Sequence, residues 1–153
     1  MKTSQKIVLL PFDTYLGVIK NSVGAKLFRN AYATINGKKT DLLKNGNVSC
    51  AFYVSSLLAM TGLLKNPHTT VSGTIKDLRA SGWKITKNPR VGDILVWEAI
   101  DFGKNNYHRH IGFYIGNNRA ISNNYKKSCP TIHSWNFRGK RKIELILTNK
   151  KLR

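Results

Sequence analysis

A change in the spacing of apolar residues near Trp83 constrains the fold of this chain more than any other feature. Before that point, apolar side chains recur every three or four positions, as in amphipathic helices. After it they alternate with polar residues, as in strands that bury one face. Helices followed by strands predict an α+β fold, in which helices pack on an antiparallel sheet.

The first part of the chain is expected to be mainly helical. Apolar spacing predicts a helix from about Tyr15 to Ile35, closed by Asn36-Gly37. The strongest helix is predicted from Cys50 to Leu64, because Ser49 is a good N-cap and the following residues are good helix formers. A shorter helix is expected from Val71 to about Ala80.

The second part of the chain is expected to form a sheet. Gly116-Asn117-Asn118 separates two alternating segments and predicts a hairpin. The predicted strands, which all combine alternation with β-favouring residues, are Ile94–Trp97, His110–Ile115, Arg119–Asn123 and Ile143–Leu147.

The domain prediction rests on length and on the lack of a linker. The chain has 153 residues, 41% of them hydrophobic, which suits one domain with one core. We divide it into an N-terminal helical segment, 1–46, and a core, 47–149. The three tryptophans, Trp83, Trp97 and Trp135, are assigned to the core.

The N-terminus gives no convincing export signal. Lys2 and Lys6 precede the apolar run Ile7–Leu10, which ends at Pro11. A signal peptide needs an apolar region of about 7–15 residues, and a membrane-spanning helix needs about 20. Neither is present, so the sequence leaves the localisation unknown.

Charge indicates what the protein binds rather than how it folds. The chain carries 26 Lys and Arg against 7 Asp and Glu, a formal net charge of +19. Such a surface suits an anionic partner, for which the candidates are a cell-wall polymer, a membrane surface or nucleic acid. A compositional bias of the coding sequence explains the charge equally well.

Cys50 is the first candidate catalytic residue. It lies in the first predicted turn of its helix, where the helix dipole and unpaired N–H groups favour a thiolate. The same N–H groups can stabilise an oxyanion during acyl transfer. The alternative is a buried cysteine that only fills space. With Cys129 it could form at most one disulfide.

His110 is the candidate base for Cys50. It begins a predicted strand in which Gly112 leaves room on the same face. The imidazole needs a third polar group to orient it. A two-residue turn would put Asn123 on that face, and a three-residue turn would put Ser122 and Asn124 there. We select Asn123, because an amide oxygen orients an imidazole more firmly than a hydroxyl.

Three segments resemble the NlpC/P60 and CHAP cysteine peptidases. They are Asn47–Val54, which resembles the start of the nucleophile helix, Val91–Trp97, which resembles the Gly-Asp strand, and His110–Asn117, which resembles the histidine strand. The resemblance implies a papain-like α+β fold and hydrolysis of amide bonds in peptidoglycan peptides, by an endopeptidase or an amidase. It maps Cys50 to the nucleophile and His110 to the base, with no cofactor.

The sequence departs from that family at two positions. Ser49 precedes the cysteine, where many members have Asp. The third polar residue of the family, often a second histidine, falls near Ser122. Asn is acceptable as the third group in this broad set of peptidases.

Two other functions are kept open. Cys50, His108, His110, Cys129 and His133 offer enough ligands for tetrahedral zinc, although their spacing matches no common zinc finger. A zinc-stabilised basic protein would bind nucleic acid through its charge. A catalytically silent protein of the same fold would only bind the wall. His133 is assigned to a loop that follows the hairpin.

Overall fold

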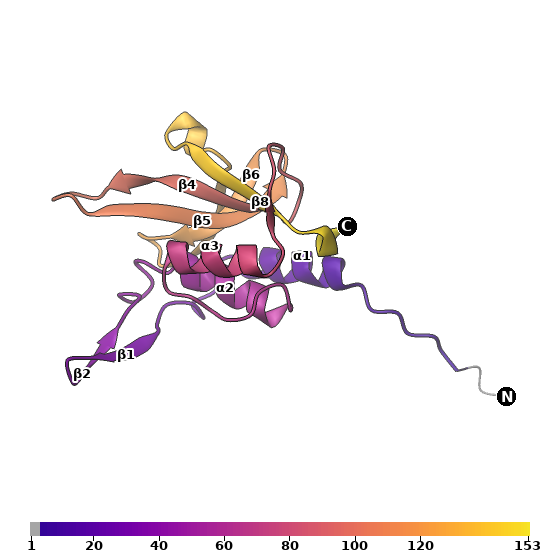
Figure 1. The fold of residues 1–153 in the computed structure, drawn as a ribbon, viewed down its shortest axis with the longest axis horizontal. Coiled ribbons are helices and arrows are strands. Elements are labelled where there is room, and N and C mark those ends of the chain that lie inside the picture. The colour runs from indigo at the N-terminus through magenta and orange to yellow at the C-terminus, as the bar shows by residue number, and fades with distance from the viewer. Residues whose placement is uncertain (1–3) are drawn as a thin grey trace.

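Helices cover one face of a six-stranded antiparallel sheet in the computed structural model, which describes residues 4–153 (Figure 1). The helices are α1 (Pro11–Asn21), α2 (Cys50–Met60) and α3 (Val71–Ala80). The predicted α+β class is confirmed. Lys2, at the start of the predicted N-terminal segment, lies outside the described residues.

The sheet has the strand order β3-β8-β4-β5-β6-β7. Its strands in chain order are β3 (Lys84–Ile85), β4 (Ile94–Asp101), β5 (Tyr107–Gly116), β6 (Arg119–Asn124), β7 (Cys129–Ser134) and β8 (Ile143–Thr148). The four predicted strands are confirmed, although β4 and β5 are longer than expected. Strand β7 was not among the predicted strands; it contains Pro130, which lacks an N–H donor. Proline is tolerated there because β7 is an edge strand.

The predicted N-terminal helix is wrong beyond Asn21. Strands β1 (Tyr32–Ile35) and β2 (Lys38–Asp41) form a separate hairpin. Its turn is Asn36-Gly37, with φ angles of 49° and 76°. Positive φ at both positions is typical of a two-residue hairpin turn, so this dipeptide joins two strands and does not end a helix. Leu27, which lies inside the segment predicted as a helix, is exposed.

The main core lies between the helices and the sheet. It combines residues of the predicted N-terminal segment, such as Tyr15, with residues of the predicted core segment. Tyr53 of α2 meets Phe113 of β5 edge to face, with ring centroids 5.5 Å apart. A smaller core on the other face of the sheet contains Trp97. The tryptophan assignment is confirmed for Trp83 and Trp97, which are buried, whereas Trp135 is only partly buried.

Asp93 joins three parts of the chain at the start of β4. Its carboxylate is fully buried and pairs with the Arg153 guanidinium at 2.9 Å. It also accepts hydrogen bonds from Thr148 Oγ1 at 2.6 Å and from the backbone N–H of Arg90 at 2.7 Å. Next to it, Tyr15 donates to the Gly92 carbonyl, which fixes α1 to the sheet.

Residues 4–10, before α1, extend away from the sheet and helices (Figure 1), and the side chains of Ile7–Leu10 are exposed. Short 3-10 helices follow β7 (η1, Phe137–Gly139) and β8 (η2, Lys150–Leu152). Within residues 4–153, every helix is too short or too polar to span a membrane.

Candidate active site

Cys50 is the first residue of α2 and lies beside a split in the sheet. The β5–β6 ladder ends at the pair Gly112–Ser122, although both strands continue beyond it. The backbone N–H of Ile111, on β5, faces the Cys50 sulfur. The loop before α2 is fixed to the other side of the split, because Asn123 Nδ2 donates to the Gly46 carbonyl at 2.9 Å. A residue at a helix N-terminus therefore lies next to the strand that carries His110.

The N-terminus of α2 has no side-chain cap. Ser49 occupies the N-cap position as predicted, but its side chain makes no capping hydrogen bond. Its Oγ is buried without a partner. The first-turn N–H groups are therefore free of a side-chain cap and can bind an anion.

Electrostatics keep the resting Cys50 sulfur protonated. Burial raises the pKa of the Cys50 thiol, and this effect exceeds the opposing influence of the N–H groups of Ile111 and Ala51 and of the Arg141 charge. The thiolate expected from the helix N-terminus alone is therefore not the resting state. Sequence position predicts the helix dipole correctly, whereas the desolvation that outweighs it arises only when the chain packs.

His110 lies on the sheet face that is turned away from the helices. It pairs across the ladder with Trp97, and the two ring centroids are 5.3 Å apart. Burial, and to a smaller extent the charges of Arg141 and His133, lower the pKa of His110 to about 3. The imidazole is therefore neutral at physiological pH. Within residues 4–153, no hydrogen bond joins it to the Cys50 sulfur.

Ser122, and not Asn123, contacts His110. Ser122 Oγ lies 2.7 Å from His110 Nε2. The turn has two residues, Asn117 and Asn118, which by itself would favour Asn123. A bulge between Tyr114 and Gly116 shifts the register by one residue and reverses the faces. The predicted contact with Asn123 therefore does not form.

His133 extends this contact into a chain of three side chains. Its Nε2 lies 2.7 Å from Ser122 Oγ, and its Nδ1 lies 2.8 Å from the Ser134 carbonyl oxygen. His133 lies in β7, opposite Ala120, and not in the expected loop. Phe137 stacks on its ring with centroids 4.2 Å apart.

The chain of hydrogen bonds fixes the tautomer of His110. The Ser134 carbonyl can only accept, so His133 carries its proton on Nδ1. Burial lowers the pKa of His133, which leaves the ring neutral and Nε2 as an acceptor. Ser122 must then donate to His133 and accept from His110 Nε2–H. His110 Nδ1 therefore carries no proton, and its lone pair has no hydrogen-bond partner among the described residues.

Gly112 provides the space for this arrangement. A Cβ atom there would lie 2.6 Å from the Ile121 carbonyl oxygen, 2.7 Å from Ser122 Cβ and 3.1 Å from Trp97 Cη2. A side chain at this position would push Ser122 away from His110. The sequence indicated this role, because Gly112 follows His110 by two positions on the same face.

The ligands proposed for zinc do not come together. Both cysteines are free. Among residues 4–153 no three His, Cys, Asp or Glu side chains gather at one point. His110 and His133 are linked through Ser122 Oγ.

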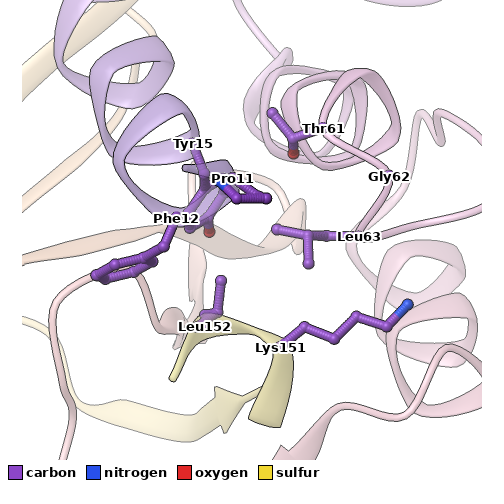
Figure 2. A pocket seen from close by; sticks show the side chains of 8 residues that line it. All are labelled: Pro11, Phe12, Tyr15, Thr61, Gly62, Leu63, Lys151 and Leu152. Atoms are coloured by element: carbon purple, nitrogen blue, oxygen red, sulfur yellow. The ribbon is translucent and has the colours of Figure 1, made fainter. Parts of the chain in front are cut away.

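Two pockets lie away from these residues. Figure 2 shows an apolar pocket of about 320 Å³, where Phe12 and Tyr15 of α1 meet Leu63 and Leu152. A second pocket of about 610 Å³, near Asp93, is lined by basic and polar side chains. Neither is lined by Cys50 or His110.

Comparison of the chain with protein-family models and with curated proteins found no match.

Proposed function

We propose that the protein is a cysteine hydrolase that cleaves amide bonds in peptidoglycan peptides. The observation that carries the proposal is the tautomer of His110. Its Nε2–H is bound to Ser122, so its bare Nδ1 can accept a proton. Cys50, whose sulfur faces the backbone N–H of Ile111, the residue after His110, is the proton donor in this proposal.

The reaction starts from a neutral thiol and a neutral imidazole. His110 Nδ1 takes the Cys50 proton, directly or through one water, as the sulfur forms a bond with the amide carbonyl carbon. The developing oxyanion is stabilised by the uncapped first-turn N–H groups of α2. The tetrahedral intermediate collapses, the C–N bond breaks, and the proton on Nδ1 passes to the leaving amine.

The second half of the reaction regenerates the thiol. His110 Nδ1 accepts a proton from water, whose oxygen attacks the thioester carbonyl. The C–S bond breaks, and the proton returns from Nδ1 to the Cys50 sulfur. Ser122 and His133 keep the imidazole in one orientation throughout and stabilise the imidazolium formed in each half.

The fold and the charge are consistent with this function. A papain-like fold is proposed because a cysteine at the start of a helix packs against an antiparallel sheet that carries the histidine. The order Cys50, Gly92-Asp93, His110 resembles the NlpC/P60 and CHAP pattern. The +19 charge would hold the enzyme on an anionic cell-wall polymer.

Release of new amino groups from purified peptidoglycan tests the proposal. We expect the wild type to release them and Cys50→Ala to release none while it remains folded. Cys129→Ala is the matched control, because Cys129 is the other free cysteine and lies in edge strand β7. Full activity of Cys50→Ala, or wall binding by the wild type without any release, would overturn the proposal.

A further inference from the structure

Arg141 is a buried cation held between two strands. The residue is 9% exposed. Nε donates to the Glu98 carbonyl at 2.9 Å, and Nη2 donates to the His108 carbonyl at 2.6 Å. These carbonyls belong to β4 and β5, where a bulge between Trp97 and Ile100 interrupts the ladder. The guanidinium is thus fixed two residues from His110 along β5.

Arg141 forms no ion pair with a carboxylate of residues 4–153. The ion pairs of the described residues are His68–Asp77, Arg109–Glu144 and Arg153–Asp93. The Glu98 carboxylate acts on the Arg141 charge without forming an ion pair with it, and its Oε1 accepts from the backbone N–H of Lys142. A buried guanidinium outside any ion pair is only partly compensated, so it can bind a further anion.

The guanidinium also keeps donors for such an anion. Arg141 Nη1 makes no hydrogen bond within the described residues. It is nevertheless absent from the buried side-chain atoms that lack a partner there, which are Ser49 Oγ and Ser56 Oγ. Arg141 Nη1 therefore reaches accessible space. The Arg141 charge also acts on both Cys50 and His110 and lowers the pKa of each.

The geometry points to Arg141 as the receptor for a substrate carboxylate beside the scissile amide. This assignment rests on the proposed function and adds a substrate class, a peptide with a free carboxylate next to the cleaved bond. A guanidinium binds a carboxylate through charge-assisted hydrogen bonds. Binding would also cancel the charge that opposes protonation of His110, so the base would become stronger when substrate is present.

Two alkylating reagents of similar size test this inference on the free protein. Iodoacetate carries a carboxylate and iodoacetamide does not, and both react with the same thiolate. Their rate ratio at Cys50 is therefore independent of the thiol pKa. The ratio at Cys129 in the same sample is the control for attraction by the overall charge. Peptide mass spectrometry gives both ratios.

We expect the iodoacetate-to-iodoacetamide ratio at Cys50 to fall on the order of tenfold in Arg141→Gln, and less in Arg141→Lys. The ratio at Cys129 should stay constant. For the wild type, acetate should slow the reaction of Cys50 with iodoacetamide more than chloride at equal ionic strength. This measurement decides the question if Arg141→Gln does not fold.

An unchanged ratio in a folded Arg141→Gln, or equal protection by acetate and chloride, would overturn the inference. The outcomes separate it from the proposed function. If wall hydrolysis requires Cys50 but the alkylation ratio is unchanged in Arg141→Gln, the role of Arg141 is disproved and the proposed hydrolase function stands. If the alkylation ratio depends on Arg141 but the wild type does not hydrolyse the wall, the hydrolase function is disproved and carboxylate binding at Arg141 stands.

Discussion

His110 Nε2 lies 2.7 Å from Ser122 Oγ because strand β5 has a bulge before its turn. Without the bulge, the two-residue turn would put Asn123 on this face. A hydroxyl can accept from one imidazole and donate to another, whereas an amide offers separate atoms for these roles. The bulge therefore determines that His133 acts on His110 through a single oxygen atom.

Removing the hydroxyl should weaken catalysis without unfolding the protein. In Ser122→Ala, His110 loses the acceptor that holds its proton on Nε2, and we expect kcat to fall by about 10- to 100-fold. Nitrogen-15 NMR of the imidazoles should show a mixture of His110 tautomers. Ser56→Ala is the matched control, because its Oγ is buried without a partner and its loss should change neither readout. Unchanged tautomers in Ser122→Ala would contradict the prediction.

Asn123 should affect stability rather than the imidazole. Asn123→Ala leaves the buried Gly46 carbonyl without its 2.9 Å hydrogen bond. We expect a loss of about 1–3 kcal/mol in the free energy of unfolding, measured with urea. The His110 tautomer should remain that of the wild type. A tautomer shift as large as that of Ser122→Ala would show that Asn123 acts on His110 after all.

Burial of neutral His110 predicts acid sensitivity. Its pKa is about 3 in the folded protein and about 6.5 in an unfolded chain, so between these values only the unfolded state binds the proton. The stabilising contribution is complete above pH 6.5 and is lost as the pH falls toward 3. His133 acts in the same direction, and Arg141 is the fixed charge that faces His110.

His110→Gln isolates this contribution, because glutamine does not titrate. Between pH 6 and 4, the unfolding free energy of the wild type should fall more steeply than that of His110→Gln, by about 1.4 kcal/mol per pH unit. Urea titrations of both proteins across this range measure the difference. Parallel pH profiles would contradict a buried neutral His110.

Two glycine substitutions should change stability in opposite directions. Gly112→Ala places Cβ 2.6 Å from the Ile121 carbonyl oxygen and should cost about 1–3 kcal/mol while displacing Ser122. Gly17, inside α1, has open space around it, so Gly17→Ala should gain up to about 1 kcal/mol. Thermal unfolding compares the two. Equal effects would mean that the contact around Gly112 is not tight.

Much of the fold was predictable from local patterns. Helical and alternating spacing gave α3 at its observed bounds, the start of α2 at Cys50, and the strands that carry Trp97 and His110. The predictions failed where one local pattern is compatible with two different structures. Asn36-Gly37 is a turn in the β1–β2 hairpin, and Pro130 lies in an edge strand.

By itself, the amino-acid sequence determined the order of helices and strands, the position of Cys50 at a helix start and the empty space that Gly112 leaves beside His110. Tertiary structure alone decided that Ser122 replaces Asn123, that His133 joins the site and that Arg141 lies within electrostatic reach of Cys50. The reason is physical. Backbone propensity and side-chain periodicity act over a few residues, whereas a one-residue bulge, an added edge strand and the desolvation of a thiol depend on segments that meet only in the folded chain.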